Sequence, residues 1–563
     1  MNPAVWVVHP PRPEADALAG ALDIPPALAR VLVNRKILTE EAARAFLYGD
    51  IDRLHDPYLM KGMDKAVSRI GDAISRGEKI LIFGDYDVDG VLSTVMLKKA
   101  LTTLGAKVEY FIPERLTDGY GIKDEHVSIP VERGAALVIS VDCGIKSVEF
   151  AARAREQGID VIITDHHRPG ESLPEAVAVL NPVLPDSGYP DAGLAGVGVV
   201  FKLVQALLKK AGKDAGLPHY MKLVSIGTVA DVAELKGENR IFVKHGLKGL
   251  RSVSNPGLRS LIEACGLGRR KISEGDLGFR IGPRINAAGR MGKTDLAVRL
   301  FFSEDPAESL ALVQKLEELN AQRQKTEEKI FNEARDRIEE RGLDKKYKCL
   351  VLGSPDWHRG VIGIVASKLK DRFNRPVVLF HYENGKAHGS GRSISEVPLI
   401  DLLEDCKQHF LSYGGHRLAV GCTLPTASMA AFKATLNPLA DARIADDCLK
   451  KKIKIDGPLE FAAVDERFMA TFALLLPFGV GNPKPLFMAD NVEVISDPQV
   501  LQGKHLKFLA RQKGRVLEAL GWDKADWRHL LRRGSRVSLA FSLMTSEYLG
   551  ETKVNLSIED LRA

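Results

Sequence analysis

Five short apolar runs rich in valine and isoleucine alternate with helical stretches between residues 78 and 180. The runs are Lys79-Ile-Leu-Ile-Phe, Lys107-Val-Glu-Tyr-Phe-Ile, Ala136-Leu-Val-Ile-Ser-Val, Asp160-Val-Ile-Ile-Thr and Ala176-Val-Ala-Val-Leu. Apolar runs that are separated by helices are typical of parallel strands with helices on both faces of the sheet. The pattern therefore predicts an α/β domain built on a mostly parallel sheet.

Acidic residues follow three of these runs directly. The motifs are Gly84-Asp85-Tyr-Asp87-Val-Asp89-Gly90, Asp142-Cys-Gly144 and Asp165-His166-His167. Because the carboxyl ends of parallel strands lie at one edge of a sheet, we expect these carboxylates and imidazoles to lie close together. A fourth candidate is Asp231, which ends the apolar run Gly227-Thr-Val-Ala.

The first acidic motif also matches the start of a calcium-binding EF-hand loop. That loop needs a glutamate at its twelfth position, where this chain has Met96. It also needs a preceding helix, where the apolar pattern predicts a strand. We exclude an EF-hand on these grounds, and a solvated acidic turn remains the weaker alternative because the flanking runs are apolar.

Clustered carboxylates repel one another in apolar surroundings, so a cation should hold them together. A mixed set of aspartate and histidine ligands favours Mn²⁺, with Mg²⁺ as the alternative. Five or more ligands suit two ions about 3.5–4 Å apart, an arrangement that activates water against phosphate esters. A single aspartate after a strand is usually a turn or a helix cap, but the whole set predicts a metal-dependent phosphoesterase.

The rest of the chain divides into segments of different character. Residues 1–75 are predicted to form short helices, residues 76–305 the α/β domain, and residues 306–345 a long connecting helix. Few apolar residues follow Leu319, so the second half of that helix is expected to be exposed. A smaller α/β domain is expected over 346–440, and short alternating strands over 450–563 predict a β-barrel or sandwich.

Composition excludes several protein classes. With 45% hydrophobic and 27% charged residues the chain is typical of globular protein and not of disordered protein. Its six cysteines include no C-x-x-C pair, which argues against a disulfide framework and favours a reducing, cytoplasmic compartment. We find no secretory signal and no run of about 18 apolar residues, so no membrane partner is expected.

The formal net charge of +6 is unevenly distributed. Residues 268–293 hold seven lysines and arginines against two acids, and residues 501–536 hold ten against three. Phe508, Trp522 and Trp527 lie within the second stretch. Basic residues for phosphates and aromatic faces for bases are what single-strand binding needs, although a basic stretch is also compatible with a plain solvated face.

The acidic motifs resemble those of the DHH phosphoesterase superfamily, and the chain as a whole resembles the RecJ family of single-stranded-DNA-specific exonucleases within it. Supporting stretches are Gly282-Pro-Arg284-Ile-Asn286-Ala-Ala-Gly-Arg290, Trp357-His358-Arg-Gly360, Gly389-Ser390-Gly391-Arg392-Ser393 and Gly414-Gly415-His416. The last three resemble a DHHA1 domain. Phe478-Gly-Val-Gly-Asn-Pro resembles the opening of the RecJ OB-fold domain, which implies that the C-terminal strands form an OB-fold barrel.

The resemblance implies a ligand set for two Mn²⁺ or Mg²⁺ ions. That set is Asp85, Asp87, Asp89, Asp142, His166 and Asp231, with Asp142 bridging the ions and with Asp85 and His167 as ligands or their immediate neighbours. Several relatives carry a histidine two residues before the first aspartate, where this chain has Phe83. One ion is therefore expected to depend more on carboxylates or water.

The resemblance also implies a substrate-binding set. Arg115, Ser390 and Arg392 would hold a terminal 5′ phosphate, although the Gly-Ser-Gly sequence alone is more typical of a hairpin turn. Further substrate contacts are expected from Tyr120, Arg284, Asn286 and Arg290. His416 would contact the scissile phosphate or cap a helix.

The implied activity is a 5′→3′ exonuclease on single-stranded DNA that releases 5′ mononucleotides in DNA repair and recombination, with a helicase and a single-strand-binding protein as candidate partners. One alternative is a phosphodiesterase of short oligonucleotides or cyclic dinucleotides, whose DHH–DHHA1 relatives lack a third domain. Another is an inactive DNA-binding scaffold, which would be expected to have lost the metal ligands that this chain retains.

Overall fold

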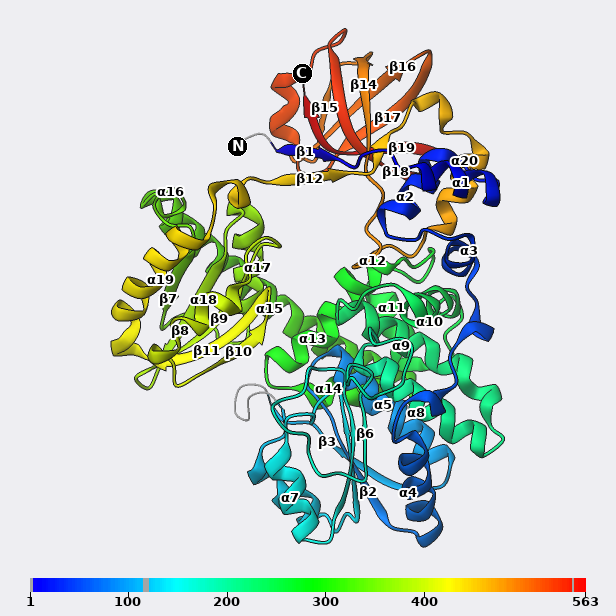
Figure 1. Cartoon of the computed structure of the whole chain (residues 1–563), viewed down its shortest axis with the longest axis vertical. Helices are drawn as coiled ribbons and strands as arrows, with labels where there is room; N and C mark the ends of the chain where they lie inside the picture. The colour runs from blue at the N-terminus through cyan, green and yellow to red at the C-terminus, as the bar shows by residue number, and fades with distance from the viewer. Residues whose placement is uncertain (1–3, 115–120, 549–550, 563) are drawn as a thin grey trace. The chain divides into compact units, whose positions relative to one another are not determined.

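The computed structural model describes residues 4–114, 121–548 and 551–562, which form two compact units (Figure 1). The barrel unit comprises Met1–Leu54, Glu234–Ile241 and Lys451–Ala563. The larger unit comprises His55–Ala233 and Phe242–Lys450. Among the described helices, none is both long and apolar enough to span a bilayer.

The predicted parallel sheet is confirmed. Its strands follow the order β3-β2-β4-β5-β6, and every neighbouring pair is parallel. Their bounds are β2 Lys79–Phe83, β3 Lys107–Phe111, β4 Leu137–Val141, β5 Asp160–Thr164 and β6 Ala178–Leu180. All five residues of β4 are buried, as expected for a central strand that is covered on both faces.

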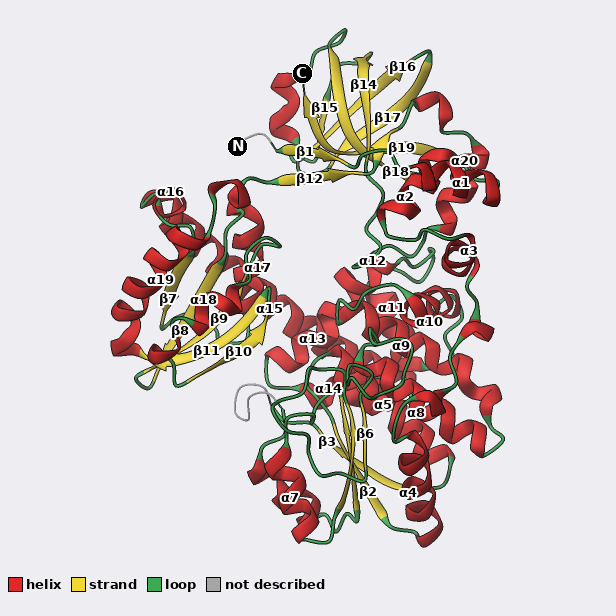
Figure 2. Ribbon diagram, viewed as in Figure 1, coloured by secondary structure: helices red, strands yellow, loops and turns green. Residues whose placement is uncertain are grey.

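Helices alternate with these strands along the chain and pack against the sheet (Figure 2). Those that matter for the site are α5 Val88–Thr103, α8 Gly196–Lys210, α9 Leu217–Ala230, α10 Gly237–Gly249, α11 Pro256–Ala264, α13 Gly282–Arg290 and α14 Thr294–Phe302. Helix α5 starts directly after β2 and packs against both α8 and α9. Most of its residues are buried, so its first turn, which carries the acidic motif, is held firmly at the sheet edge.

The long helix α15, Pro306–Glu340, forms where it was predicted, but the expected exposure of its second half is wrong. Ile330, Ala334 and Ile338 recur every fourth residue and are fully buried against β7, Leu350–Ser354, and α17, Ile362–Phe373. Arg323 and Glu327 are also buried, and their side chains are 2.5 Å apart. A narrow apolar stripe is enough to bury one face of a helix. The low overall apolar content of this segment therefore led to the wrong prediction of exposure.

The smaller sheet of the larger unit has the order β10-β11-β9-β8-β7, in which only β7 and β8 are parallel. The other bounds are β8 Val377–Glu383, β9 Lys386–Arg392, β10 Ser412–His416 and β11 Ala419–Pro425. The Gly-Ser-Gly-Arg segment therefore lies in strand β9, so the alternative of a hairpin turn is wrong, and the expected contact of Ser390 and Arg392 with a 5′ phosphate stays a prediction. A side chain at Gly389 would lie 2.4 Å from the Phe380 ring, so close packing requires glycine there.

Five strands of the barrel unit close into the predicted OB-fold barrel. They are β14 Phe487–Val494, β16 His505–Gln512, β17 Arg515–Gly521, β18 Arg536–Tyr548 and β19 Glu551–Arg562. The barrel closes where β14 pairs with β16. Short pairings at its margins extend the sheet without opening it.

Only Met1–Leu54 of the predicted N-terminal segment belongs to the barrel unit, and the rest belongs to the larger unit. The helices α1 Pro13–Leu22, α2 Pro26–Asn34 and α3 Glu40–Tyr48 form as predicted, and their apolar residues share one core with the barrel strands. Strand β1, Val5–Val8, was not predicted, so an all-helical start is wrong. It pairs in parallel with β12, Lys452–Ile455. Because that partner lies far away in the sequence, the residues around β1 show no pattern that predicts the pairing.

Candidate metal centre

The first acidic motif is held by two helix N-termini. Asp87 caps α5, because its Oδ1 accepts a hydrogen bond of 3.1 Å from the backbone nitrogen of Gly90. Asp89 is buried in the first turn of α5 and accepts bonds of 2.8 and 2.7 Å from the backbone nitrogens of Gly196 and Val197. These two amides begin α8, whose positive end favours the carboxylate.

Asp142 lies directly after β4 in a left-handed backbone conformation, with φ of 60°. Aspartate is one of the few side chains that adopt this conformation readily. A Cβ atom at Gly196 would lie 2.5 Å from Asp142 Oδ1. The start of α8 can therefore approach both Asp89 and Asp142 only because residue 196 is glycine.

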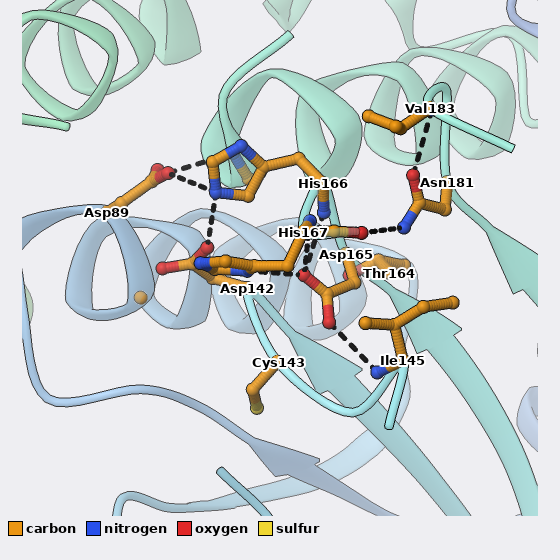
Figure 3. Close-up of polar contacts among 12 residues, drawn as sticks. Asp89, Asp142, Cys143, Ile145, Thr164, Asp165, His166, His167, Asn181 and Val183 are labelled. Carbon is orange, nitrogen blue, oxygen red and sulfur yellow. Dashed lines mark hydrogen bonds and ion pairs between the residues drawn. The ribbon is translucent and has the colours of Figure 1, made fainter. Parts of the chain in front are cut away.

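Asp165 organises the histidine pair (Figure 3). Its Oδ1 accepts hydrogen bonds from the backbone nitrogens of His166 and His167, at 2.8 and 3.0 Å, and lies 2.7 Å from His167 Nδ1. Its Oδ2 accepts a bond of 2.9 Å from the backbone nitrogen of Ile145. Burial raises the pKa of Asp165, but the bonds from His167 outweigh this effect and lower it overall. Asp165 therefore orients the loop and the His167 ring.

His166 points into the group of carboxylates (Figure 3). Its Nε2 lies 3.2 Å from Asp142 Oδ1 and 4.0 Å from Asp89 Oδ2, and its Nδ1 lies 3.9 Å from Oδ2 of Asp231, which follows α9. Three sets of potential ligand atoms each fall within 4.8 Å of one another: Asp142, His166 and His167; Asp89, His166 and Asp231; Asp85, Asp87 and Asp142. The residues predicted from the strand ends thus come together.

The donor atoms fit a divalent cation. Asp142 Oδ1 and His166 Nε2 are buried, face each other and make no hydrogen bond. Burial raises the pKa of Asp89 to about 7, with a further contribution from Asp87, and it raises the pKa values of Asp142 and Asp231 well above the usual range. Burial and the neighbouring His167 lower the pKa of His166 to about 4. Crowded carboxylate oxygens and a neutral imidazole are the ligands that Mn²⁺ or Mg²⁺ would accept.

Ser390 and Arg392 lie on β9 beside the first turn of α17. A Cβ atom at Gly363 in that turn would lie 2.8 Å from Ser390 Oγ and 3.2 Å from Arg392 Nη2. Arg392 Nη1 donates a hydrogen bond of 3.3 Å to Ser390 Oγ and one of 2.8 Å to the Gly391 carbonyl. A pocket of about 570 Å³ is lined by Ser390, by Arg359 and by Tyr86 of the first acidic motif.

The three predicted residues of α13 make contacts within the protein. Asn286 Oδ1 accepts a hydrogen bond of 3.2 Å from the backbone nitrogen of Val88 at the start of α5. Arg284 forms an ion pair with Glu317 of α15. Arg290 Nη1 donates a bond of 3.0 Å to the carbonyl of Gly360. These contacts position the acidic motif and its surroundings, and the expected substrate contacts of these residues stay predictions.

The remaining predicted substrate residues differ in outcome. His416 is the last residue of strand β10, so the alternative that it caps a helix is wrong. Its side chain is exposed, yet partial desolvation and the nearby charges of His167, Arg168 and Lys146 lower its pKa. Arg115 and Tyr120 lie outside the described residues.

The aromatic residues of the basic segments are not equivalent. Phe508 is only 1% exposed because it points into the barrel core from β16, so its predicted role in stacking on bases is wrong. Trp522 is 50% exposed, and the Trp527 ring packs beneath Lys524 Nζ at 4.3 Å. Phe279, which the sequence patterns did not single out, is 86% exposed within a π-helical turn, Leu277–Ile281.

Several positioning residues were missed as well. They are Asp165, treated only as the start of its motif, Gly196, and Asn181, whose Nδ2 donates a bond of 2.9 Å to the His167 carbonyl. The glycines of Ala195-Gly196-Val197-Gly198 at the start of a helix were the available signal for a close approach.

We expect Asp142→Asn to stabilise the metal-free protein, because it removes one charge from the buried group and asparagine also tolerates the left-handed backbone. In EDTA at about pH 8 the gain should be about 1–2 kcal/mol by urea unfolding. A buried acid with a raised pKa costs stability as the pH rises, so the gain should shrink toward about pH 4. Asp186→Asn, at an exposed site, is the matched control, and a less stable Asp142→Asn protein would contradict this account of the site.

Three family models match the chain: the DHH family N-terminal domain over residues 79–228, the DHHA1 domain over 344–441 and the RecJ OB domain over 455–560. The chain is 38% identical to the single-stranded-DNA-specific exonuclease RecJ of Bacillus subtilis, over 99% of this chain and 70% of the relative. It is 33% identical to that of Escherichia coli, over 96% of both chains.

A crystal structure of RecJ from Thermus thermophilus in complex with Mn²⁺ is similar over 99% of this chain and 79% of the other, with a TM-score of 0.85 and 33% identity. A second structure of that RecJ contains Mg²⁺ and has a TM-score of 0.78, with 32% identity. Similarity of this extent in sequence, domain order and fold covers essentially the whole chain. The chain therefore belongs to the RecJ family of single-stranded-DNA-specific exonucleases.

Proposed function

We propose that this protein is a metal-dependent exonuclease that degrades single-stranded DNA from the 5′ end and releases 5′ mononucleotides, in DNA repair and recombination. The observation that carries the proposal is the buried pair Asp142 Oδ1 and His166 Nε2, 3.2 Å apart and without hydrogen bonds. Its membership of the RecJ family gives the substrate class. The retained acidic motifs argue against an inactive scaffold.

Two Mn²⁺ or Mg²⁺ ions would be held by Asp85, Asp87, Asp89, Asp142, His166 and Asp231. When bound, such ions activate water and stabilise the leaving oxygen of a phosphodiester. The chain contributes orientation, because α8 holds Asp89 and Asp165 holds His167. Burial lowers the pKa of His167, but the bond with Asp165 outweighs this effect and raises it. His167 is therefore suited to hold a proton beside the reacting phosphate.

The 5′→3′ polarity would come from the pocket at β9. Ser390 and Arg392 lie beside the first turn of α17, where a helix N-terminus and a guanidinium both favour a phosphate. Tyr86 connects this pocket with the first acidic motif. A terminal phosphate bound in this pocket would place the next phosphodiester near the carboxylates of the proposed metal centre. Arg115 is the third residue expected to contact the terminal phosphate.

The barrel would hold the rest of the strand. Lys507, Arg515 and Lys553 line a pocket of about 1000 Å³ on its surface together with Asp465, Glu466 and Glu518, and Lys507 is paired with Glu518 at 2.7 Å. The phosphates of a single strand would contact the basic side chains there. The exposed ring of Trp522 offers a face on which bases stack. Deletion of residues 450–563 would expose the apolar faces of α1–α3, which share a core with the barrel. Point substitutions therefore test the role of the barrel in DNA binding better than this deletion does.

With this activity we propose a helicase and a single-strand-binding protein as partners and the cytoplasm as the compartment. A helicase or a single-strand-binding protein would present the strand. All six cysteines are free thiols, as the proposed cytoplasmic location requires. Pull-down of this chain with a helicase or a single-strand-binding protein from the same cell tests the partners, and absence of both would contradict them.

We expect nuclease activity on 3′-labelled single-stranded DNA to require added Mn²⁺ or Mg²⁺ and to fall at least about 10³-fold in Asp142→Asn, because that change removes a proposed shared ligand. Activity should remain unchanged in Asp186→Asn, whose carboxylate is exposed. Release of nucleotides in EDTA, or full activity of Asp142→Asn, would contradict the site. Short dinucleotide substrates, tested in parallel, should be cleaved more slowly than a long strand that also contacts the barrel.

Arg392→Gln should reduce the preference for a 5′-phosphorylated over a 5′-hydroxyl strand by about ten-fold, since one charge-assisted contact to phosphate is lost. The readout is the ratio of kcat/KM for the two substrates. Arg417→Gln, an exposed arginine just after β10, should leave that ratio unchanged. An unaltered ratio in Arg392→Gln would show that the 5′ phosphate is bound elsewhere.

A further inference from the structure

A second cavity, of about 650 Å³, lies among the helices of the larger unit. It is lined by the second half of α5, the end of α8, the start of α9, the region around the start of α11 and the end of α14. None of the proposed metal ligands, and neither Ser390 nor Arg392, is among the described residues that line it. Its volume falls in the range of small-molecule sites.

Four lysines contribute to its wall: Lys98, Lys99, Lys213 and Lys222. The described residues include no ion-pair partner within 4.0 Å for any of these four ammonium groups, and Glu304 is the only carboxylate in the lining. Lys222 Nζ donates a hydrogen bond of 2.8 Å to the Ser252 carbonyl, and Lys213 Nζ one of 2.9 Å to the Thr103 carbonyl. The lining thus carries an excess of positive charge, which favours an anionic ligand.

The floor of the cavity is apolar. Leu208, Leu223, Leu258 and Phe301 are each less than 9% exposed and line it. The Phe302 ring also lines it, with Lys98 Nζ and Lys99 Nζ 4.9 and 5.7 Å from the ring centroid and the Tyr110 ring stacked on it at 6.3 Å. Lys98, Lys99 and Lys222 are partly buried, and desolvation lowers their pKa values. Glu109 and Asp295 near Lys98 and Glu304 near Lys99 oppose this effect only in part, so an anion would compensate the remaining charge.

A ligand that matches this lining carries both an anionic group and a flat, largely apolar group. Thr102 and Ser254 also line the cavity and their hydroxyls suit the hydroxyls of a sugar, whereas the Asn255 side chain caps α11 and donates to the Phe301 carbonyl. We propose that this cavity binds a nucleoside phosphate, with its phosphate on Lys98, Lys99 and Lys222 and its base against the buried leucines.

The cavity and the metal centre share one helix. Asp89 lies in the first turn of α5 and Lys99 in its second half, about 15 Å further along at 1.5 Å per residue. The proposal does not depend on the nuclease activity, because the two sites use different residues. A protein that binds nucleotide in this cavity without cleaving DNA would support this proposal and contradict the proposed exonuclease activity.

The test is equilibrium binding of adenosine 5′-monophosphate and 5′-triphosphate to the full chain in EDTA. The Arg392→Gln background is used so that the pocket at β9 contributes less. We expect one saturable site, weaker by about ten-fold or more in Lys99→Gln and in Lys222→Gln, since each removes a charged contact. Lys209→Gln, an exposed lysine of α8 outside the cavity, should bind as the background does.

Inorganic phosphate alone and adenosine alone should each bind at least about ten-fold more weakly than the nucleotide, because each fills only one half of the site. Circular dichroism of every variant checks that it is folded. Absence of saturable nucleotide binding, or equal affinity in folded Lys99→Gln and Lys222→Gln, would overturn the proposal. Binding of an acidic peptide but of no nucleotide would overturn it as well.

Discussion

Repulsion among buried carboxylates is the constraint on which this structure depends. Asp89 and Asp142 are almost completely buried, and Asp231 lies beside them around His166. The protein partly offsets this repulsion with backbone amides at the start of α8 and with the helix dipole of α5, which begins at Asp87. In the metal-free chain the carboxylates take up protons more readily, as their raised pKa values show, and the proposed cations would supply the remaining compensation near neutral pH.

The surrounding structure serves to keep that arrangement in place. Asp165 fixes the histidine loop, Asn286 holds the start of α5, and Gly196 lets α8 approach two carboxylates at once. Arg290 connects α13 with the segment that precedes α17, so the acidic motifs and the pocket at β9 are linked within one unit. This link would let the proposed 5′-phosphate pocket and the proposed metal centre act on neighbouring phosphates of one strand.

The acidic site was largely predictable because its residues follow local rules. Parallel strands are recognised by their apolar runs, and their carboxyl ends meet at one edge, so Asp89, Asp142 and His166 could be placed together before any contact was known. The features that escaped prediction depend on distant partners. Strand β1 pairs with β12 at the other end of the chain, and β9 lies inside a sheet although its composition resembles a turn. Phe508 points inward because of the register of β16, which composition does not reveal.

The central claim is that the buried carboxylates form a site for two cations that share Asp142. Titration of the metal-free chain with Mn²⁺, followed by electron paramagnetic resonance of the free ion, measures it directly. The account predicts about two tightly bound ions per chain and the loss of at least one of them in Asp142→Asn. Absence of tight binding, or the same number of bound ions in Asp142→Asn as in the original chain, would contradict it.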